Sequence, residues 1–185
     1  MERRTKYLEW AGFFVCLGLG VLLHFLYEWS GYHPAAALIA PVNESLWEHG
    51  KLYTVPVLLW TAVEAAAVPG TVRQRIPART AALYLMIFGT FAGYYLYTGV
   101  VGRNVDWMNI ALYVLLLATG FLLSGWLMRQ PGTGAWWMPA VFLLILLVSL
   151  QLNLTVDPPE WGLFRDPSTG GYGIPEALPG SAIPV

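Results

Sequence analysis

Charged residues and cysteines are scarce in this sequence. Only 11% of its 185 residues are Asp, Glu, Lys or Arg, whereas 57% are hydrophobic. A soluble domain usually has roughly 25% charged residues, and a water-soluble fold of this length would lack the polar side chains to cover its surface. The single cysteine, Cys16, excludes an intramolecular disulfide. No basic patch is present, so nucleic-acid binding is not expected. These absences indicate an integral membrane protein.

Five long apolar runs occupy most of the chain. They cover residues 10–29, 46–68, 81–101, 107–128 and 136–154. Because a membrane-spanning helix needs about 20 mostly apolar residues, each run is long enough to cross a bilayer. The sequence therefore predicts an all-α integral membrane protein. Residues 1–155 form a five-helix transmembrane domain in this prediction, and residues 156–185 form an irregular, Pro- and Gly-rich tail.

The basic residues predict the orientation of the chain in the membrane. Seven of the ten Lys and Arg residues fall on the side of the N-terminus, and three fall on the opposite side. Cytoplasmic loops carry the excess of positive charge in membrane proteins. We therefore predict a cytoplasmic N-terminus and an extracytoplasmic tail. The seven residues are Arg3, Arg4, Lys6, Arg73, Arg75, Arg79 and Arg129.

Carboxylates and two histidines gather where the first two predicted spans meet on the outer side. His24 and Glu28 lie one helical turn apart at the end of the first span, and Glu44, Glu48 and His49 stand at the start of the second. Histidine with Asp or Glu is the ligand mixture that suits zinc and other divalent transition metals. The candidate metal ligands are His24, Glu28, Glu48 and His49.

A metal ion at this position would support hydrolytic chemistry. The candidate catalytic residues are Glu44 and Lys51, with Glu44 as general base on a metal-bound water. The substrate would be a lipid or lipid-linked group that enters from the outer leaflet. The sequence has no HExxH pair, so the mechanism of the zincin proteases does not transfer.

The same residues also have structural interpretations. Ser45 and Glu48 match an S-x-x-E capping box, and Glu44 lies where a helix dipole favours a negative charge. Lys51 can pair with any of the three neighbouring glutamates. The cluster would then be a salt-bridged helix junction without a ligand. Haem ligation by the two histidines is a third alternative.

Further polar residues are predicted at the outer ends of the last three spans. Together with the histidine cluster they would form a one-sided polar basin, which argues against a continuous channel because a channel needs polar residues at every depth. In the inner half Glu64 is the isolated acid, and we expect it to pair with Arg73 or Arg75. The outer polar residues are Tyr94, Tyr95, Tyr97, Asn104, Asp106, Asn109, Gln151 and Asn153.

Two features leave alternatives open. The tail up to Pro175 carries enough aromatic and aliphatic side chains to fold back as a lid, with Arg165 or Asp166 near the acidic cluster, or it remains a loose tail. Gly89 and Gly93 form a small-xxx-small pair that permits close helix contact, either within the chain or between two chains.

Three segments carry a resemblance to a known family. HFLYEWSG at 24–31, APVNESLWEHGKL at 40–52 and FRDPSTGGYGIP at 164–175 resemble the signatures of an uncharacterised family of small multi-pass membrane proteins. That family has an APVNES-x-WEH-x-KL pattern and a late DP-x-TG-x-YGI pattern. The resemblance implies a protein of a bacterial or archaeal cell membrane and singles out the same cluster, but it implies no activity.

Two classes of function follow. The first is a metal-dependent membrane enzyme that acts on a lipid or lipid-linked substrate, with a divalent metal such as zinc as cofactor. The second is non-catalytic: a sensor or carrier of protons or metal ions, or an accessory subunit of a larger membrane complex. The expected partners are the lipid bilayer and either a lipid substrate or another membrane subunit.

Overall fold

The computed structural model describes residues 2–68 and 70–175, and their side chains from Lys6 onward. These residues form helices and connecting loops without a β-strand; the one isolated antiparallel bridge joins Arg165 and Tyr172. In chain order the helices are α1 (Glu2–Trp29), α2 (Pro34–Ala37), α3 (Leu46–His49), α4 (Lys51–Ala67), α5 (Val72–Val101), α6 (Asp106–Leu127), the 3-10 helix η1 (Thr133–Trp136) and α7 (Trp137–Val156).

The prediction of an all-α chain is confirmed, but the prediction of five transmembrane helices needs correction. Among the described residues, four segments are long and apolar enough to cross a membrane: 6–29 in α1, 72–101 in α5, 106–127 in α6 and 133–156 in η1 and α7. The predicted second span divides into the short α3 and the 17-residue α4, with buried Glu48, Lys51 and Glu64 along it. Such charged positions belong inside a protein core rather than against lipid.

Short helices in the connections raise the number of helices above five. His33 caps α2 by accepting a hydrogen bond from the amide of Ala35, and Pro34 opens that helix. Ser45 caps α3 through a hydrogen bond from the amide of Glu48. These caps satisfy amides that a helix start leaves free.

Helices α1 and α5 begin eight and nine residues before their apolar runs. Because backbone hydrogen bonding does not require apolar side chains, α5 continues through the basic segment that was predicted as a loop. Arg75 and Arg79 are consequently buried. Arg75 lies 2.7 Å from Glu64, which confirms that predicted pair, and Arg79 lies 2.8 Å from Glu64 and 2.9 Å from Glu9. Burial of these charges is tolerable because opposite charges face each other.

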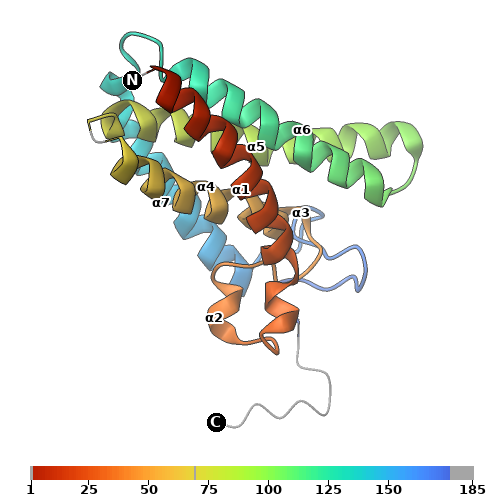
Figure 1. Cartoon of the computed structure of the whole chain (residues 1–185). Helices are drawn as coiled ribbons and strands as arrows, with labels where there is room; N and C mark the ends of the chain where they lie inside the picture. The colour runs from red at the N-terminus through yellow and green to blue at the C-terminus, as the bar shows by residue number, and fades with distance from the viewer. Residues whose placement is uncertain (1, 69, 176–185) are drawn as a thin grey trace.

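The long helices pack around α5, which contacts α4, α6 and α7, while α1 packs on α4 and α6. In Figure 1 the α5–α6 hairpin crosses the other helices and its turn projects to the right, away from α2. Gly89 and Gly93 lie against Leu116 and Leu112 of α6, where an added Cβ would come within 2.6 and 2.7 Å of a leucine methyl. This small-residue pair therefore serves a contact within the chain. Cys16 is fully buried in the same core.

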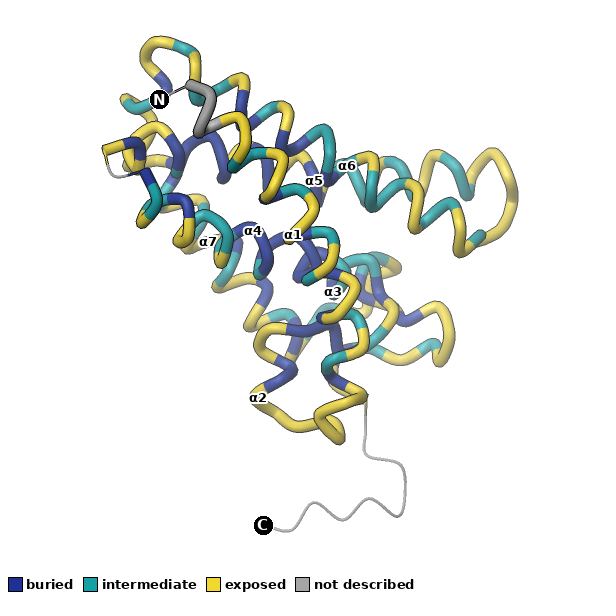
Figure 2. Tube along the Cα trace, in the orientation of Figure 1, coloured by how far each residue is buried: buried dark blue, intermediate teal, exposed yellow. Residues whose placement is uncertain are grey.

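Large apolar side chains are exposed on the outside of the long helices. Figure 2 shows exposed positions recurring along each of them. They include Phe14 on α1, Phe88 on α5, Leu122 on α6 and Ile145 on α7, each more than half exposed. So many large, exposed apolar side chains are unusual on a protein in water.

Candidate metal centre

The end of α1 and the two ends of α3 bring three predicted site residues together. His24 lies in the second-last turn of α1, Glu44 immediately precedes the Ser45 cap of α3, and His49 is the last residue of α3. Asn43 fixes the loop that carries Glu44, because its Oδ1 accepts a hydrogen bond from the Ser45 amide at 2.9 Å. The Ser45 cap and the Asn43 hydrogen bond thus position Glu44 and His49 beside α1.

The carboxylate of Glu44 lies between the two imidazoles. Nε2 of His24 is 3.8 Å from Oε1 of Glu44, and Nε2 of His49 is 3.5 Å from Oε2. The possible ligand atoms of the three residues all lie within 4.8 Å of one another. Ligands at 2.0–2.2 Å from a tetrahedral zinc ion are about 3.3 Å apart, so small side-chain movements would bring this group to coordination distance.

The hydrogen bond of His49 determines which of its nitrogens is available. Nδ1 of His49 lies 2.8 Å from the carbonyl oxygen of Ser45. A carbonyl only accepts, so Nδ1 of His49 is a donor in either charge state, and Nε2, which faces Glu44, is the nitrogen that a metal would bind. Nδ1 of His24 is buried and has no hydrogen-bond partner among the described residues. The group therefore presents two imidazoles and one carboxylate, a set that suits zinc.

The three side chains are partly open to the surroundings. The side chains of His24 and His49 are 29% and 27% exposed, and that of Glu44 is 52% exposed. A metal held by three protein ligands at such a position would keep a coordination site for water or substrate. Glu28, one turn beyond His24, is also exposed and lies outside the group of three.

Glu48 and Lys51 lie in a separate buried pair. Oε2 of Glu48 accepts hydrogen bonds from Nζ of Lys51 at 2.8 Å and from the amide of Val42 at 3.0 Å. Nζ also donates to the carbonyl oxygens of Ala37 and Ala40 at 2.8 and 3.2 Å. All three ammonium hydrogens are thereby used. The pair ties α3 to the loop before it. Glu44 instead lies with His24 and His49, and these three residues are called the histidine group below.

The capping box is formed only in part. Ser45 accepts from the Glu48 amide as predicted, but the Glu48 side chain does not return to the amide of Ser45, which donates to Asn43. Glu48 instead accepts a hydrogen bond from Oγ1 of Thr155 on α7, at 2.7 Å. Thr155 was not predicted as a site residue. The sequence offered one indication of its role, a polar side chain on the mostly apolar last helix.

The described part of the tail folds back onto α3. The side-chain amide of Asn43 donates to the carbonyl of Gly173 at 2.7 Å, and the amide of Trp47 donates to the carbonyl of Leu163 at 3.2 Å. The rings of Trp47 and Phe164 pack with their centroids 5.2 Å apart. These contacts hold the tail beside the loop that carries Glu44.

Asp166 stabilises a tight loop within the tail rather than joining the histidine group. Its carboxylate accepts hydrogen bonds from the amide and hydroxyl of Ser168 and from the hydroxyl of Thr169. Burial raises the pKa of Asp166, but these hydrogen bonds lower it by more, so the pKa lies below its ordinary value. The carboxylate is thus held in its charged form.

A comparison with known protein families matches nearly the whole described chain. The model of a family of unknown function (DUF6512) covers residues 2–174. The chain belongs to this family. The match includes all three histidine-group residues and the loop of Asp166. No curated protein and no solved structure matches the chain. Membership of DUF6512 therefore leaves the function to be inferred from the geometry.

Three polar residues around the turn between α5 and α6 form a second cluster in this DUF6512 member. Tyr97 donates to Asn104 at 2.8 Å and also bonds to Asn109, and the Asn109 amide donates to Asn104 at 2.8 Å. These residues tie the turn of the α5–α6 hairpin to itself. They do not join the histidine group, so the predicted common basin divides into separate clusters.

Proposed function

We propose that this protein is a multi-pass membrane protein that binds a divalent transition-metal ion, with zinc as the first candidate. The observation that carries the proposal is the convergence of His24, Glu44 and His49 from α1 and from both ends of α3. The hydrogen bond from Nδ1 of His49 to the carbonyl oxygen of Ser45 supports it, because it holds the ring with Nε2 toward Glu44.

The membrane location is supported by the surface and by the four long apolar helices. Exposed leucine, phenylalanine and tryptophan side chains on these helices suit contact with lipid tails. The charge distribution predicts that the histidine group faces the outer side. In this proposal the protein resides in a bacterial or archaeal cell membrane.

The open coordination position suggests a use for the metal. A divalent ion with three protein ligands lowers the pKa of a bound water and polarises a carbonyl or phosphoryl oxygen. We therefore propose hydrolysis of a lipid or lipid-linked group at the outer interface. In this scheme Glu44 serves as a ligand, and Glu28, exposed one turn beyond His24, is the carboxylate available as general base.

A non-catalytic sensor is the second candidate, and the position of the tail favours it. Glu44 precedes α3 and His49 ends it, and Trp47 of α3 holds the tail by packing on Phe164 and donating to the carbonyl of Leu163. A metal that draws His24 toward these residues would alter the contact between α1 and α3. Such a change would be transmitted to the tail and to any subunit bound there.

Metal analysis of chelator-free protein in mild detergent tests the binding proposal. We expect close to one equivalent of zinc or another transition metal in the wild type, and at least about tenfold less in His24→Ala and His49→Ala. His33→Ala is the matched control, because His33 caps α2 and lies outside the group. Wild-type protein without metal, even after incubation with zinc or manganese, would refute the proposal.

Two further measurements separate the enzyme from the sensor. Metal-dependent release of a product from membrane lipids, lost in Glu28→Gln while metal is retained, would support the enzyme. Metal-dependent protection of the tail against hydrogen exchange, without any lipid turnover, would support the sensor.

A further inference from the structure

A cavity of about 500 Å³ lies at the opposite end of α1 from the histidine group. Its walls come from the first turns of α1, from the last turns of α6 and from Thr71 before α5. Glu9 in this cavity and His24 are 15 residues apart on one helix, which corresponds to about 22 Å. The cavity is therefore a separate site, of a size typical for small ligands.

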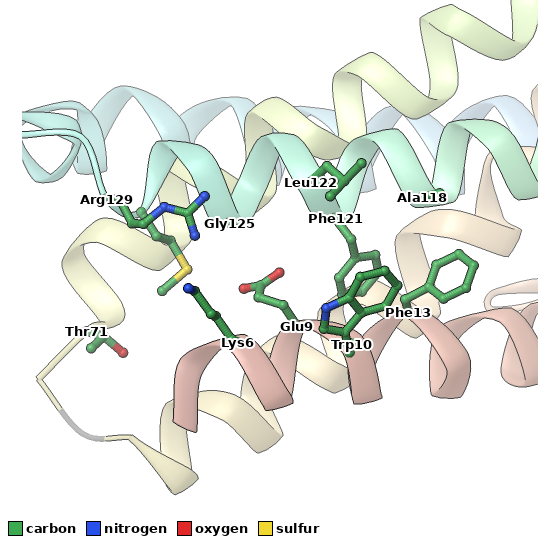
Figure 3. A pocket seen from close by; sticks show the side chains of 11 residues that line it. Lys6, Glu9, Trp10, Phe13, Thr71, Ala118, Phe121, Leu122, Gly125 and Arg129 are labelled. Carbon is green, nitrogen blue, oxygen red and sulfur yellow. The ribbon is translucent and has the colours of Figure 1, made fainter. Parts of the chain in front are cut away.

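The lining divides into a charged part and an apolar part. Figure 3 shows Lys6 and Arg129 toward one end and Phe13, Phe121 and Ala118 toward the other. Lys6 starts the apolar run of α1, and Arg129 follows α6, so both cations lie where helices reach the membrane boundary. A ligand suited to this space is amphiphilic, with a negatively charged group such as a phosphate in its head.

Glu9 lies between the two parts. Its Oε1 accepts a hydrogen bond from Nη2 of Arg79 at 2.9 Å, whereas its Oε2 is buried without a hydrogen-bond partner among the described residues. A buried carboxylate oxygen normally has a donor, and its absence is costly. A ligand with an N–H or O–H group beside its negative charge would supply that donor.

We propose that this cavity binds one glycerophospholipid whose head group carries both a phosphate and a hydrogen-bond donor. The phosphate lies between Lys6 and Arg129, the ammonium or hydroxyl of the head group donates to Glu9, and an acyl chain lies along Phe13 and Phe121. Leu122 at the edge of the cavity is 64% exposed, so the chain enters directly from the bilayer. The predicted orientation puts this site in the cytoplasmic leaflet, where anionic lipids attract basic residues.

Native mass spectrometry of the detergent-purified full chain tests this proposal with three lipids of matched acyl chains. Phosphatidylethanolamine and phosphatidylglycerol both have the phosphate and the donor, whereas phosphatidylcholine lacks the donor. We expect retention of at least one of the first two to exceed that of phosphatidylcholine by about tenfold, the value of a hydrogen bond to a charged group. Equal retention of all three would overturn the assignment of Glu9.

Paired variants test the position of the lipid. Arg129→Gln is expected to weaken retention by about tenfold, and Arg103→Gln, in the turn between α5 and α6, is expected to leave it unchanged. Leu122→Trp fills the cavity and should abolish retention. Leu115→Trp is its control, because Leu115 has similar exposure on the same helix but lies outside the cavity. Thermal unfolding checks that each variant is folded.

Two outcomes would refute the site. If Leu122→Trp and Leu115→Trp both retain as much lipid as the wild type, the lipid binds elsewhere. If the wild type is a dimer and Leu122→Trp dissociates it, the cavity contacts a second copy of the chain. The test is independent of the metal proposal, because His24→Ala should not affect lipid retention.

Discussion

Thr155 and Glu48 are joined by a buried hydrogen bond although 107 positions separate them in the sequence. The hydroxyl of Thr155 on α7 lies 2.7 Å from Oε1 of Glu48 on α3, while Oε2 of the same carboxylate accepts from Lys51. Both the glutamate and the lysine are almost completely inaccessible. The last long helix is thereby fixed to the short helix that presents His49.

Removal of one charge from this pair should strongly destabilise the protein. We expect Glu48→Ala to lower the free energy of unfolding by about 3–5 kcal/mol, because it leaves the Lys51 ammonium buried beside carbonyls alone. The double variant Glu48→Met/Lys51→Met should recover part of this loss. Unfolding followed by circular dichroism in detergent measures both effects. Glu28→Ala, at an exposed position, is the control; a similar loss there would contradict the explanation.

The buried network of Glu64 should be equally sensitive. Glu64→Ala leaves Arg75 and Arg79 with less negative charge in the core, and we expect a loss of about 3–5 kcal/mol. Arg73→Ala, which removes only an exposed hydrogen bond to the carbonyl of Gly134, should cost less than about 1 kcal/mol. The same unfolding measurement compares them. Equal stabilities of the two variants would show that the network contributes little.

Gly20 and Gly18 give a matched test of the packing of α1. A Cβ at Gly20 would come within 2.0 Å of the Tyr113 hydroxyl and 3.0 Å of the Leu52 carbonyl oxygen, whereas a Cβ at Gly18 would meet nothing within 4 Å. Gly20→Ala should therefore destabilise by about 1–3 kcal/mol. Gly18→Ala should be neutral or slightly stabilising, because alanine favours the helix. A reversed order in thermal unfolding would contradict this packing.

The loop of Asp166 should depend on pH. Because the pKa of Asp166 is lower in the folded loop than its ordinary value of 3.8, the carboxylate stabilises the loop above that value. The contribution is lost as the pH falls through the lowered pKa. We expect hydrogen exchange of residues 165–172 to stay slow at neutral pH and to lose protection below 3.8. Asp166→Asn should exchange faster at neutral pH and lose this dependence; an unchanged profile would refute the role of the carboxylate.

The apolar runs were a good guide to the helices but a poor guide to their ends. The predicted third span started at Ala81, yet α5 starts at Val72 and carries Arg75 and Arg79 into the core. Hydropathy stops at the first charge, whereas a helix continues wherever its charges find partners. Glu64 on α4 was predicted as a partner of Arg75, but Glu9, which pairs with Arg79 from α1, is distant in the sequence and was not predicted.

The candidate site shows the same division. Residue type and helical spacing were sufficient to place His24, Glu44 and His49 in one cluster, because the ends of two neighbouring helices must meet. They assigned Glu28 and Glu48 as the carboxylate ligands and Glu44 as the general base, whereas Glu44 is the carboxylate that lies between the histidines. Tertiary packing decided it: α7 brings Thr155 to Glu48 and the loop before α3 surrounds Lys51, so Glu48 is occupied in the core and Glu44 is left between the two imidazoles.

The sequence by itself determined the all-α class, the approximate helical segments and the region of the histidine cluster, because composition and local periodicity follow from neighbouring residues. Only the tertiary structure decided which charges are buried, where the tail lies and how Gly89 is used. Each of these depends on a contact between distant segments, such as Asn43 with Gly173 or Gly89 with Leu116. The energy of such contacts arises only when the whole chain has packed.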